Sequence, residues 1–138
     1  MGVRFPHCRL TLTSGKGDKE RVPLSSGLNW GQRPGRNPNQ AYLAVSVDVQ
    51  REGFFPDVGI KFRILTDDGH EFTCVRAQQN GKAIHTEKNS DLGKYFRGRI
   101  GVRPGGLVTI HHLLAYGKTW VDFYRTEDLV YKMDFSVD

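Results

Sequence analysis

Side chains that donate paired hydrogen bonds are concentrated in residues 26–42, which read SGLNWGQRPGRNPNQAY. Arginine side chains match the acceptor edge of guanine or a phosphate, and Asn and Gln side chains match the edge of adenine. The stretch contains no acidic residue, so its arginines are not neutralised by their neighbours. The composition favours a loop that contacts nucleic acid, and its candidate contacts are Asn29, Trp30, Gln32, Arg33, Arg36, Asn37, Asn39, Gln40 and Tyr42.

Residues 76–86 form a second donor-rich segment, in which Asn80-Gly81 is a strong signal for a two-residue hairpin turn. Such a turn would pair Arg76 with His85 and Gln78 with Ala83, so that Arg76, Gln78 and His85 share one face of the ribbon. The other face would present Gln79, Lys82 and Thr86. The candidate contacts in this ribbon are Arg76, Gln78, Gln79, Asn80, Lys82 and His85.

Each segment also has a simpler interpretation. Residues 26–42 could be a long surface loop held down by Trp30 and Tyr42, and residues 76–86 a solvated hairpin edge. The functional interpretation gains weight because two donor-rich protrusions leaving one small β-body are what a clamp on a DNA groove requires.

The residue pattern gives no catalytic or metal site. No histidine is followed by lysine two positions later, and no acidic residue stands two positions before a lysine, as two common nuclease motifs require. The cysteines and histidines lack the close pairs of a structural zinc site, and no Gly-Lys-Ser/Thr phosphate loop is present. We therefore expect no catalytic residue, no metal and no cofactor.

The elements that must position these segments are short strands separated by turns. Alternation or β-branched composition predicts strands at residues 7–13, 41–49, 60–66, 70–78, 107–115, 119–124 and 129–135. A short helical turn is expected within 50–59, and a helix from Asn89 to Ile100 with Lys94, Arg97 and Arg99 on a solvated face. This pattern predicts an all-β barrel or pseudobarrel with at most two small helices.

Length and charge fit a single domain at residues 1–138 with a polyanionic partner, since the chain has a net charge of +5. No apolar run approaches the roughly 20 residues of a membrane span, and residues 1–10 lack the apolar core of a secretory signal. We expect a cytoplasmic location, no membrane partner, and buried reduced thiols at Cys8 and Cys74.

Three longer segments show a resemblance to a known family. The runs SGLNWGQRPGRNPNQAYL, FRILTDDGHEFTCVRAQQNGKAIHT and NSDLGKYFRGRIGV, with the LVYKMDFS ending, resemble the B3-like DNA-recognition domain of restriction endonucleases. The resemblance is to the C-terminal domain of the NgoFVII type, whose fold is shared by the BfiI recognition domain, the EcoRII N-terminal effector domain and plant B3 transcription factors. It spans about residues 26–136, nearly the whole chain.

The resemblance implies a seven-stranded open pseudobarrel with two short helices that grips the major groove of double-stranded DNA with two arms. The N-arm falls on residues 29–42 and the C-arm on residues 76–86. The family's domain binds DNA while a nuclease domain of the same enzyme cuts it, and relatives read short GC-containing sites of the CCWGG or GCCGC kind. Gln40 stands where many relatives have glutamate, which leaves the base read there open.

Three further alternatives stay open from the residues. The domain could be placed N-terminally, as an effector, or C-terminally. A single-strand binder or a protein-interaction barrel would use Trp30, Tyr42 and the basic loop for stacking or gripping. An unrecognised nuclease is the rival from another class.

Overall fold

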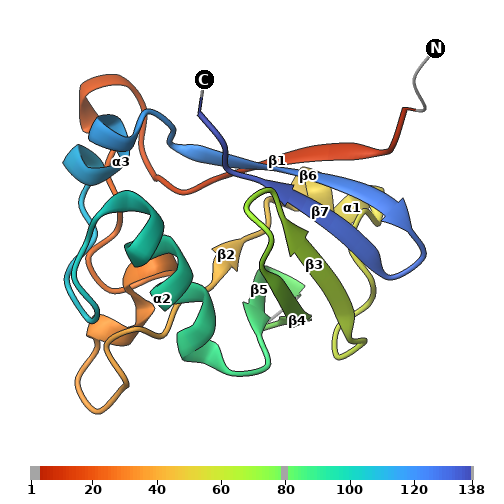
Figure 1. The fold of residues 1–138 in the computed structure, drawn as a ribbon, viewed down its shortest axis with the longest axis horizontal. Coiled ribbons are helices and arrows are strands. Elements are labelled where there is room, and N and C mark those ends of the chain that lie inside the picture. The colour runs from red at the N-terminus through yellow and green to blue at the C-terminus, as the bar shows by residue number, and fades with distance from the viewer. Residues whose placement is uncertain (1–3, 79–80, 138) are drawn as a thin grey trace.

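A computed structural model describes residues 4–78 and 81–137 of the chain. Its described residues contain one seven-stranded sheet with the strand order β1-β6-β7-β3-β4-β5-β2, shown in Figure 1. The strands are β1 (His7–Thr11), β2 (Leu43–Ala44), β3 (Phe62–Thr66), β4 (Glu71–Ala77), β5 (Ala83–Thr86), β6 (Trp120–Glu127) and β7 (Val130–Asp134). The helices are α1 (Val47–Glu52), α2 (Asn89–Ile100) and α3 (Ile110–Tyr116), with 3-10 turns η1 (Gly17–Lys19) and η2 (Gly27–Gln32).

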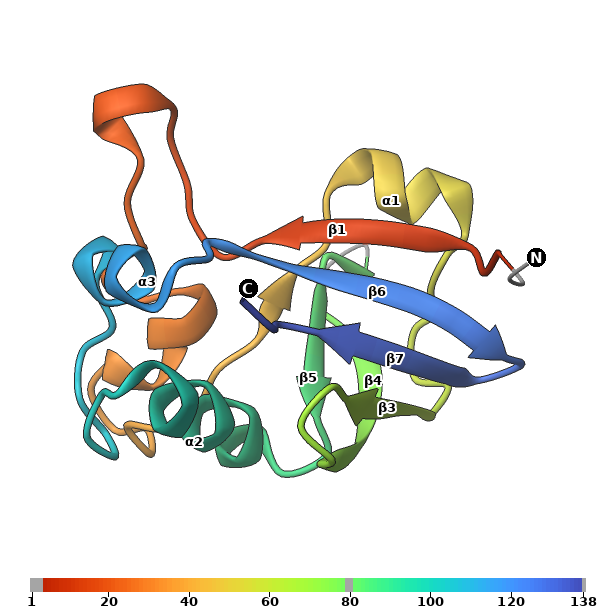
Figure 2. The same cartoon turned by 45° about the horizontal axis from the view of Figure 1, so that its top comes forward.

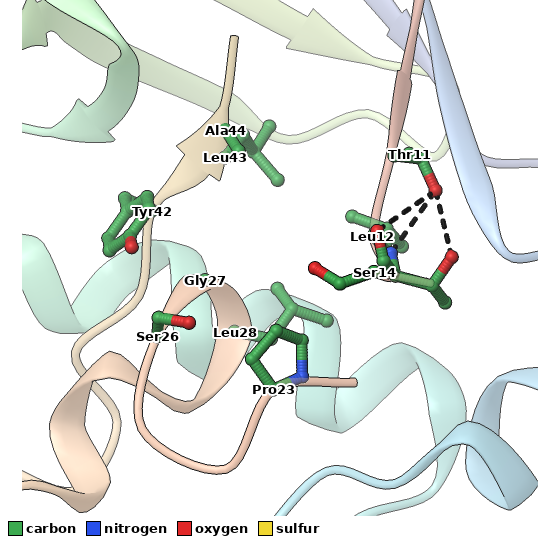
Figure 3. A pocket seen from close by; sticks show the side chains of 11 residues that line it. Thr11, Leu12, Ser14, Pro23, Ser26, Gly27, Leu28, Tyr42, Leu43 and Ala44 are labelled. Atoms are coloured by element: carbon green, nitrogen blue, oxygen red, sulfur yellow. Dashed lines mark hydrogen bonds between the residues drawn. The ribbon is translucent and has the colours of Figure 1, made fainter. Parts of the chain in front are cut away.

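The sheet curls until its two end strands approach each other. Neighbouring strands are antiparallel except for β3 and β7, which run parallel. The edge strands β1 and β2 face each other across a cleft of about 70 Å³, lined on one side by Thr11 and Leu12 and on the other by Leu43 and Ala44 (Figure 3). The sheet is therefore a nearly closed barrel with one open seam, which confirms the predicted seven-stranded pseudobarrel.

The barrel is filled by alternate residues of the strands and by apolar side chains from outside them, including two aromatic residues that follow α1. Tyr131 and Met133 share the buried face of β7, and Phe135, one residue beyond the strand, is buried as well. Phe55 reaches the core after α1, and its ring centroid lies 5.1 Å from that of Tyr131 and 5.4 Å from that of Phe123. Phe54 is also buried, so both residues of the Phe-Phe pair pack into the core beside α1.

Two predicted strands are helices instead. Most of residues 41–49 is not a strand, because Ser46 caps α1 by accepting a hydrogen bond from the Val49 N–H and Gly53 ends it with a φ of 65°. Residues 110–116 form α3, since Thr109 and His112 make a capping box at its start. In both segments the apolar residues alternate with the period of a strand, which led to the wrong prediction. The caps at Ser46 and Thr109 begin helices there instead. The described residues thus contain three α-helices rather than two.

Cys8 and Cys74 are free and buried, as predicted. Burial, together with the nearby carboxylates of Glu52 and Asp122, raises the pKa of the Cys8 thiol to about 12, and burial raises that of Cys74 to about 12 as well. Both thiols therefore stay protonated at neutral pH. None of the helices in the described ranges has the length and hydropathy of a membrane span.

The prediction of a solvated face on α2 holds for Lys94 and is wrong for the two arginines. Arg97 is 1% exposed. Arg99 forms an ion pair with Asp67 in the β3–β4 turn and donates to the hydroxyl of Tyr116 on α3 over 2.8 Å. Arg99 therefore joins a turn and two helices rather than facing solvent.

Acid should destabilise the fold through Asp68, in the same turn. Burial would raise the pKa of this carboxyl, but hydrogen bonds from Thr66 Oγ1 and Tyr95 Oη outweigh burial and lower the pKa to about 2. The pKa of Asp68 in the folded protein lies below the ordinary value of about 3.9. The ionised carboxyl therefore stabilises the fold fully above roughly pH 4, and this stabilisation is lost as the pH falls towards 2.

Urea unfolding at pH 5 and pH 2.5 measures this effect, and the midpoint should be lower at pH 2.5. The variant Asp68→Asn has no carboxyl to titrate, so its midpoint should fall less between the two pH values. An equal fall in both proteins would contradict the assignment to Asp68.

Candidate nucleic-acid interface

Asn29 anchors the start of the N-arm inside the protein. Its side chain is completely buried. Asn29 Nδ2 donates to the carbonyls of Pro23 and Val108, both over 2.8 Å, and its Oδ1 accepts from the Val108 N–H over 2.9 Å. All hydrogen-bonding groups of this amide are thus used within the fold, and its role is to hold η2 in place.

A buried guanidinium supports the same region from α2. Arg97 donates from Nε to the carbonyl of Gly106 over 2.7 Å, and from its two terminal nitrogens to the carbonyls of Gly93 and Leu28 over 3.3 and 3.2 Å. Leu28 lies in η2, so Arg97 connects the N-arm, the helix and the turn before α3. Burial lowers the pKa of Arg97.

Asn39 anchors the far part of the N-arm. This residue is 8% exposed, and its Oδ1 accepts from the Gly105 N–H over 2.6 Å. Gln32 braces the same loop, because its Nε2 donates to the carbonyls of Pro38 and Gly105 over 3.0 and 3.2 Å. The predicted contacts Asn29, Gln32 and Asn39 therefore have structural partners within the protein.

The exposed side of the N-arm carries Arg33, Arg36 and Asn37, with Gln40 half-buried beside them. Arg33 Nε donates to the carbonyl of Ser25 over 2.9 Å, which leaves its terminal nitrogens for solvent or a ligand. Asn37 Oδ1 accepts from the Asn39 N–H over 2.9 Å and closes a local turn. This side of the loop is the part of the N-arm that presents donors outward.

Trp30 forms the centre of an aromatic cluster at the base of the N-arm. The Arg36 guanidinium lies 4.1 Å above its ring, and the Tyr42 ring meets it edge-on at 5.4 Å. The His85 ring of β5 lies 6.4 Å away. Trp30 therefore brings the N-arm and the C-arm into contact.

The predicted register of the C-arm hairpin is wrong by one residue. In the structure Arg76 lies opposite Ile84 and Val75 lies opposite His85. The turn is longer than two residues, since the Gly81 N–H donates to the Gln78 carbonyl and Gln78 itself has a φ of 67°. Because side chains alternate along a strand, Arg76 and His85 lie on opposite faces instead of sharing one.

Arg76 consequently points towards the barrel rather than outward. It is half-buried, and a Cβ on Gly81 would lie 2.7 Å from its Nε. Lys82 is exposed and His85 half-exposed, with His85 Nδ1 2.9 Å from the Thr86 carbonyl oxygen. Gln79 and Asn80 lie outside the described residues.

The two arms leave opposite ends of the short β2–β5 pair. At one end the Ala41 N–H donates to the Asn89 carbonyl at the start of α2, next to the N-arm. At the other end the Val45 N–H donates to the Lys82 carbonyl in the C-arm connection. Figure 1 and Figure 2 both show the N-arm loop beside α2, joined to the end of β2 that is nearer to this helix.

Two supporting residues were missed in the sequence. Arg97 stands at helical spacing with Gly93 and Ile100, which places it on the buried face of α2, but its charge suggested solvent. Gly93, in the middle of α2, was a second signal. Glycine disfavours helix, and inside a helix it usually marks a place where another part of the chain packs closely against it. The Asn39 backbone is what approaches it.

Replacing Gly93 by alanine should displace the N-arm. The added Cβ would lie 1.7 Å from the Asn39 carbonyl oxygen, a backbone atom that cannot turn aside. We expect Gly93→Ala to lower the free energy of unfolding by about 2 kcal/mol or more, measured by urea denaturation.

Gly98 of the same helix provides the matched control, since a Cβ there meets nothing within 4 Å. Gly98→Ala should stabilise the protein by up to about 1 kcal/mol through helix propensity. Equal effects of the two substitutions would show that the Gly93–Asn39 contact does not constrain the arm.

Comparison with known proteins identifies the family. The model of the NgoFVII C-terminal B3-like DNA-binding domain matches residues 4–127. A solved structure of a hypothetical protein from Arabidopsis thaliana is similar with a TM-score of 0.43 and 10% identity, over 96% of this chain and 92% of that chain. No curated protein matches. Since the family match covers most of the chain, the protein belongs to the family of NgoFVII C-terminal B3-like DNA-binding domains, with their pseudobarrel fold.

Proposed function

We propose that this domain binds double-stranded DNA sequence-specifically, with the N-arm and the C-arm entering the major groove on either side of the β2–β5 pair. The observation that carries the proposal is the placement of exposed donors at both ends of this pair, joined at the base by the contact of Trp30 with His85. Membership in a DNA-binding domain family supports the same ligand.

The candidate side chains of the two arms fall into two groups, according to whether their polar groups already have hydrogen-bond partners within the protein. We assign recognition to donors that face outward, and bracing to polar groups that are already bonded in the fold, since a buried amide cannot also reach a base edge. The bracing residues are the amides Asn29, Gln32 and Asn39, together with Asn37, which is exposed but whose oxygen closes a turn of the arm, and the proposed contacts are Arg33, Arg36, Gln40, Lys82 and His85. Arg76 would support the C-arm from its inner side, and the half-buried Gln78, at its positive φ, would shape the turn.

Duplex binding is favoured over stacking of single-stranded bases. A stacking platform needs an open aromatic face. One face of Trp30 is covered by the Arg36 guanidinium at 4.1 Å, and Tyr42 packs edge-on against the same indole. These rings are used to hold the arm and are poor platforms for bases.

In this proposal the domain is the target-recognition part of a type II restriction endonuclease, and a separate domain or subunit cuts the DNA. The described residues contain no group of three His, Cys, Asp or Glu side chains suited to a metal. The target is proposed to be a short GC-containing site of the CCWGG or GCCGC kind.

Selection from a random duplex library, followed by sequencing of the bound fraction, tests the function directly. Enrichment of one short GC-containing motif is the expected result. Equal recovery of all duplexes, or a stronger preference for single strands, would refute the proposal. Incubating the same library with Mg²⁺ should leave the DNA uncut.

Substitutions of individual residues should distinguish contacts with bases from contacts with phosphates. Arg33→Ala should relax the sequence preference by about 1–3 kcal/mol of discrimination, if its terminal nitrogens contact a base. Lys82→Ala should weaken binding to every duplex alike and reduce the slope of log affinity against log salt by about one. Fluorescence anisotropy on selected and random duplexes measures both quantities.

Lys132 on β7 is the matched control for Lys82, because both lysines are exposed and β7 lies far from β5 and β2 in the strand order. Lys132→Ala should leave affinity and salt slope nearly unchanged. A loss as large as that of Lys82→Ala would mean that only net charge matters.

A further inference from the structure

Arg36 and Gln40 form a hydrogen-bonded pair on the outward side of the N-arm. Arg36 Nη1 donates to Gln40 Oε1 over 3.1 Å. A guanidinium has only donors, so the amide atom that faces it must be the oxygen. The two remaining N–H groups of the Gln40 amide are therefore directed away from Arg36.

Both members of the pair are held in position by the rest of the arm. The Arg36 guanidinium lies 4.1 Å above the Trp30 ring, which fixes its plane. The backbone of Gln40 is bonded on both sides, because its N–H donates to the Asn37 carbonyl over 3.0 Å and its carbonyl accepts from the Gly31 N–H over 2.8 Å. A Cβ on Gly31 would lie 2.2 Å from the Asn37 oxygen, so the backbone here packs too closely for any side chain at position 31.

We propose that Arg36 and Gln40 act as one unit of hydrogen-bond donors that reads the acceptor edge of guanine in the duplex. This inference rests on the proposed function. A free glutamine matches adenine, because it accepts from the adenine N6 amine and donates to N7. Here Arg36 takes one lone pair of the glutamine oxygen and holds that oxygen towards the guanidinium, so Gln40 presents its amide N–H groups outward.

Guanine is the base that suits this arrangement. Its major-groove edge presents two adjacent acceptors, N7 and O6, whereas cytosine presents an amine and adenine places an amine beside its single acceptor. The free donors of Arg36 and the amide N–H groups of Gln40 together match two acceptors. An amine at either position would face a donor and remain unpaired.

Two substitutions change the donor pattern in different ways. Glutamate in Gln40→Glu still accepts from Arg36 but has no donor, so the guanine at one motif position should be replaced by cytosine or adenine. Arg36→Met keeps an apolar chain on Trp30 and releases the Gln40 oxygen, so adenine should gain at the same position. The preference between bases there should change by about 5- to 150-fold, the range for one bidentate contact.

Asn37→Asp is the control for charge. It adds the same negative charge to the same arm as Gln40→Glu, and its carboxylate can still accept from the Asn39 N–H. It should weaken binding to all duplexes alike without changing the selected motif. Thermal unfolding of each variant shows whether the fold is kept.

Selection of all four proteins on one duplex library distinguishes the outcomes. A change of base at one position in the two pair variants alone supports the proposal. An enriched motif that is the same in all proteins, with Gln40→Glu binding every duplex more weakly, would overturn it and assign the pair to a phosphate. A change of base with Asn37→Asp at that position would also overturn it. Absence of any duplex motif with the unaltered protein would refute the proposed function itself.

Discussion

The N-arm depends on one buried positive charge. The Arg97 guanidinium donates to three backbone carbonyls, of Leu28, Gly93 and Gly106, and within the described residues it bonds to no carboxylate. A buried charge is costly unless its donors are satisfied, so these carbonyls must keep their positions for Arg97 to remain inside. The requirement holds η2, α2 and the turn before α3 in one arrangement, and the N-arm extends from that arrangement.

Close backbone packing complements this charge. The Asn39 carbonyl rests on Gly93, and Gly31 lies against the Asn37 carbonyl, at distances that exclude a Cβ. Buried amides of Asn29 and Asn39 then satisfy backbone groups of Val108 and Gly105. A loop held in this way loses little freedom when it binds, because its exposed donors already have fixed positions.

Several parts of the structure could be predicted from the sequence. The strands with strict alternation, the Asp-Gly turn after β3 and the helix ending at Gly101 are local patterns, and the structure has them. The wrong predictions fall in segments where two local sequence patterns favour different structures. Residues 41–49 and 107–115 alternate like strands, but the caps at Ser46 and Thr109 start helices there.

The candidate site was predictable in location and less so in detail. Its donor-rich composition identified both arms, whereas the division into bracing and exposed residues depends on long-range partners. Asn29 bonds to Val108, 79 positions away, and no local pattern reveals such a pairing. The C-arm register failed because Gln78 adopts a positive φ, which lengthens a turn that Asn80-Gly81 would otherwise close in two residues.

The parallel pairing of β3 with β7 has a consequence for assembly. Of the seven strands, β7 comes last in the sequence, yet it lies between β6 and β3 and is the link between the two parts of the sheet. Before residues 130–134 are added, β1-β6 and β3-β4-β5-β2 are separate ribbons with no ladder between them. The seven-stranded sheet therefore cannot be completed progressively from its N-terminal end during synthesis, because β6 and β3 are joined only through β7.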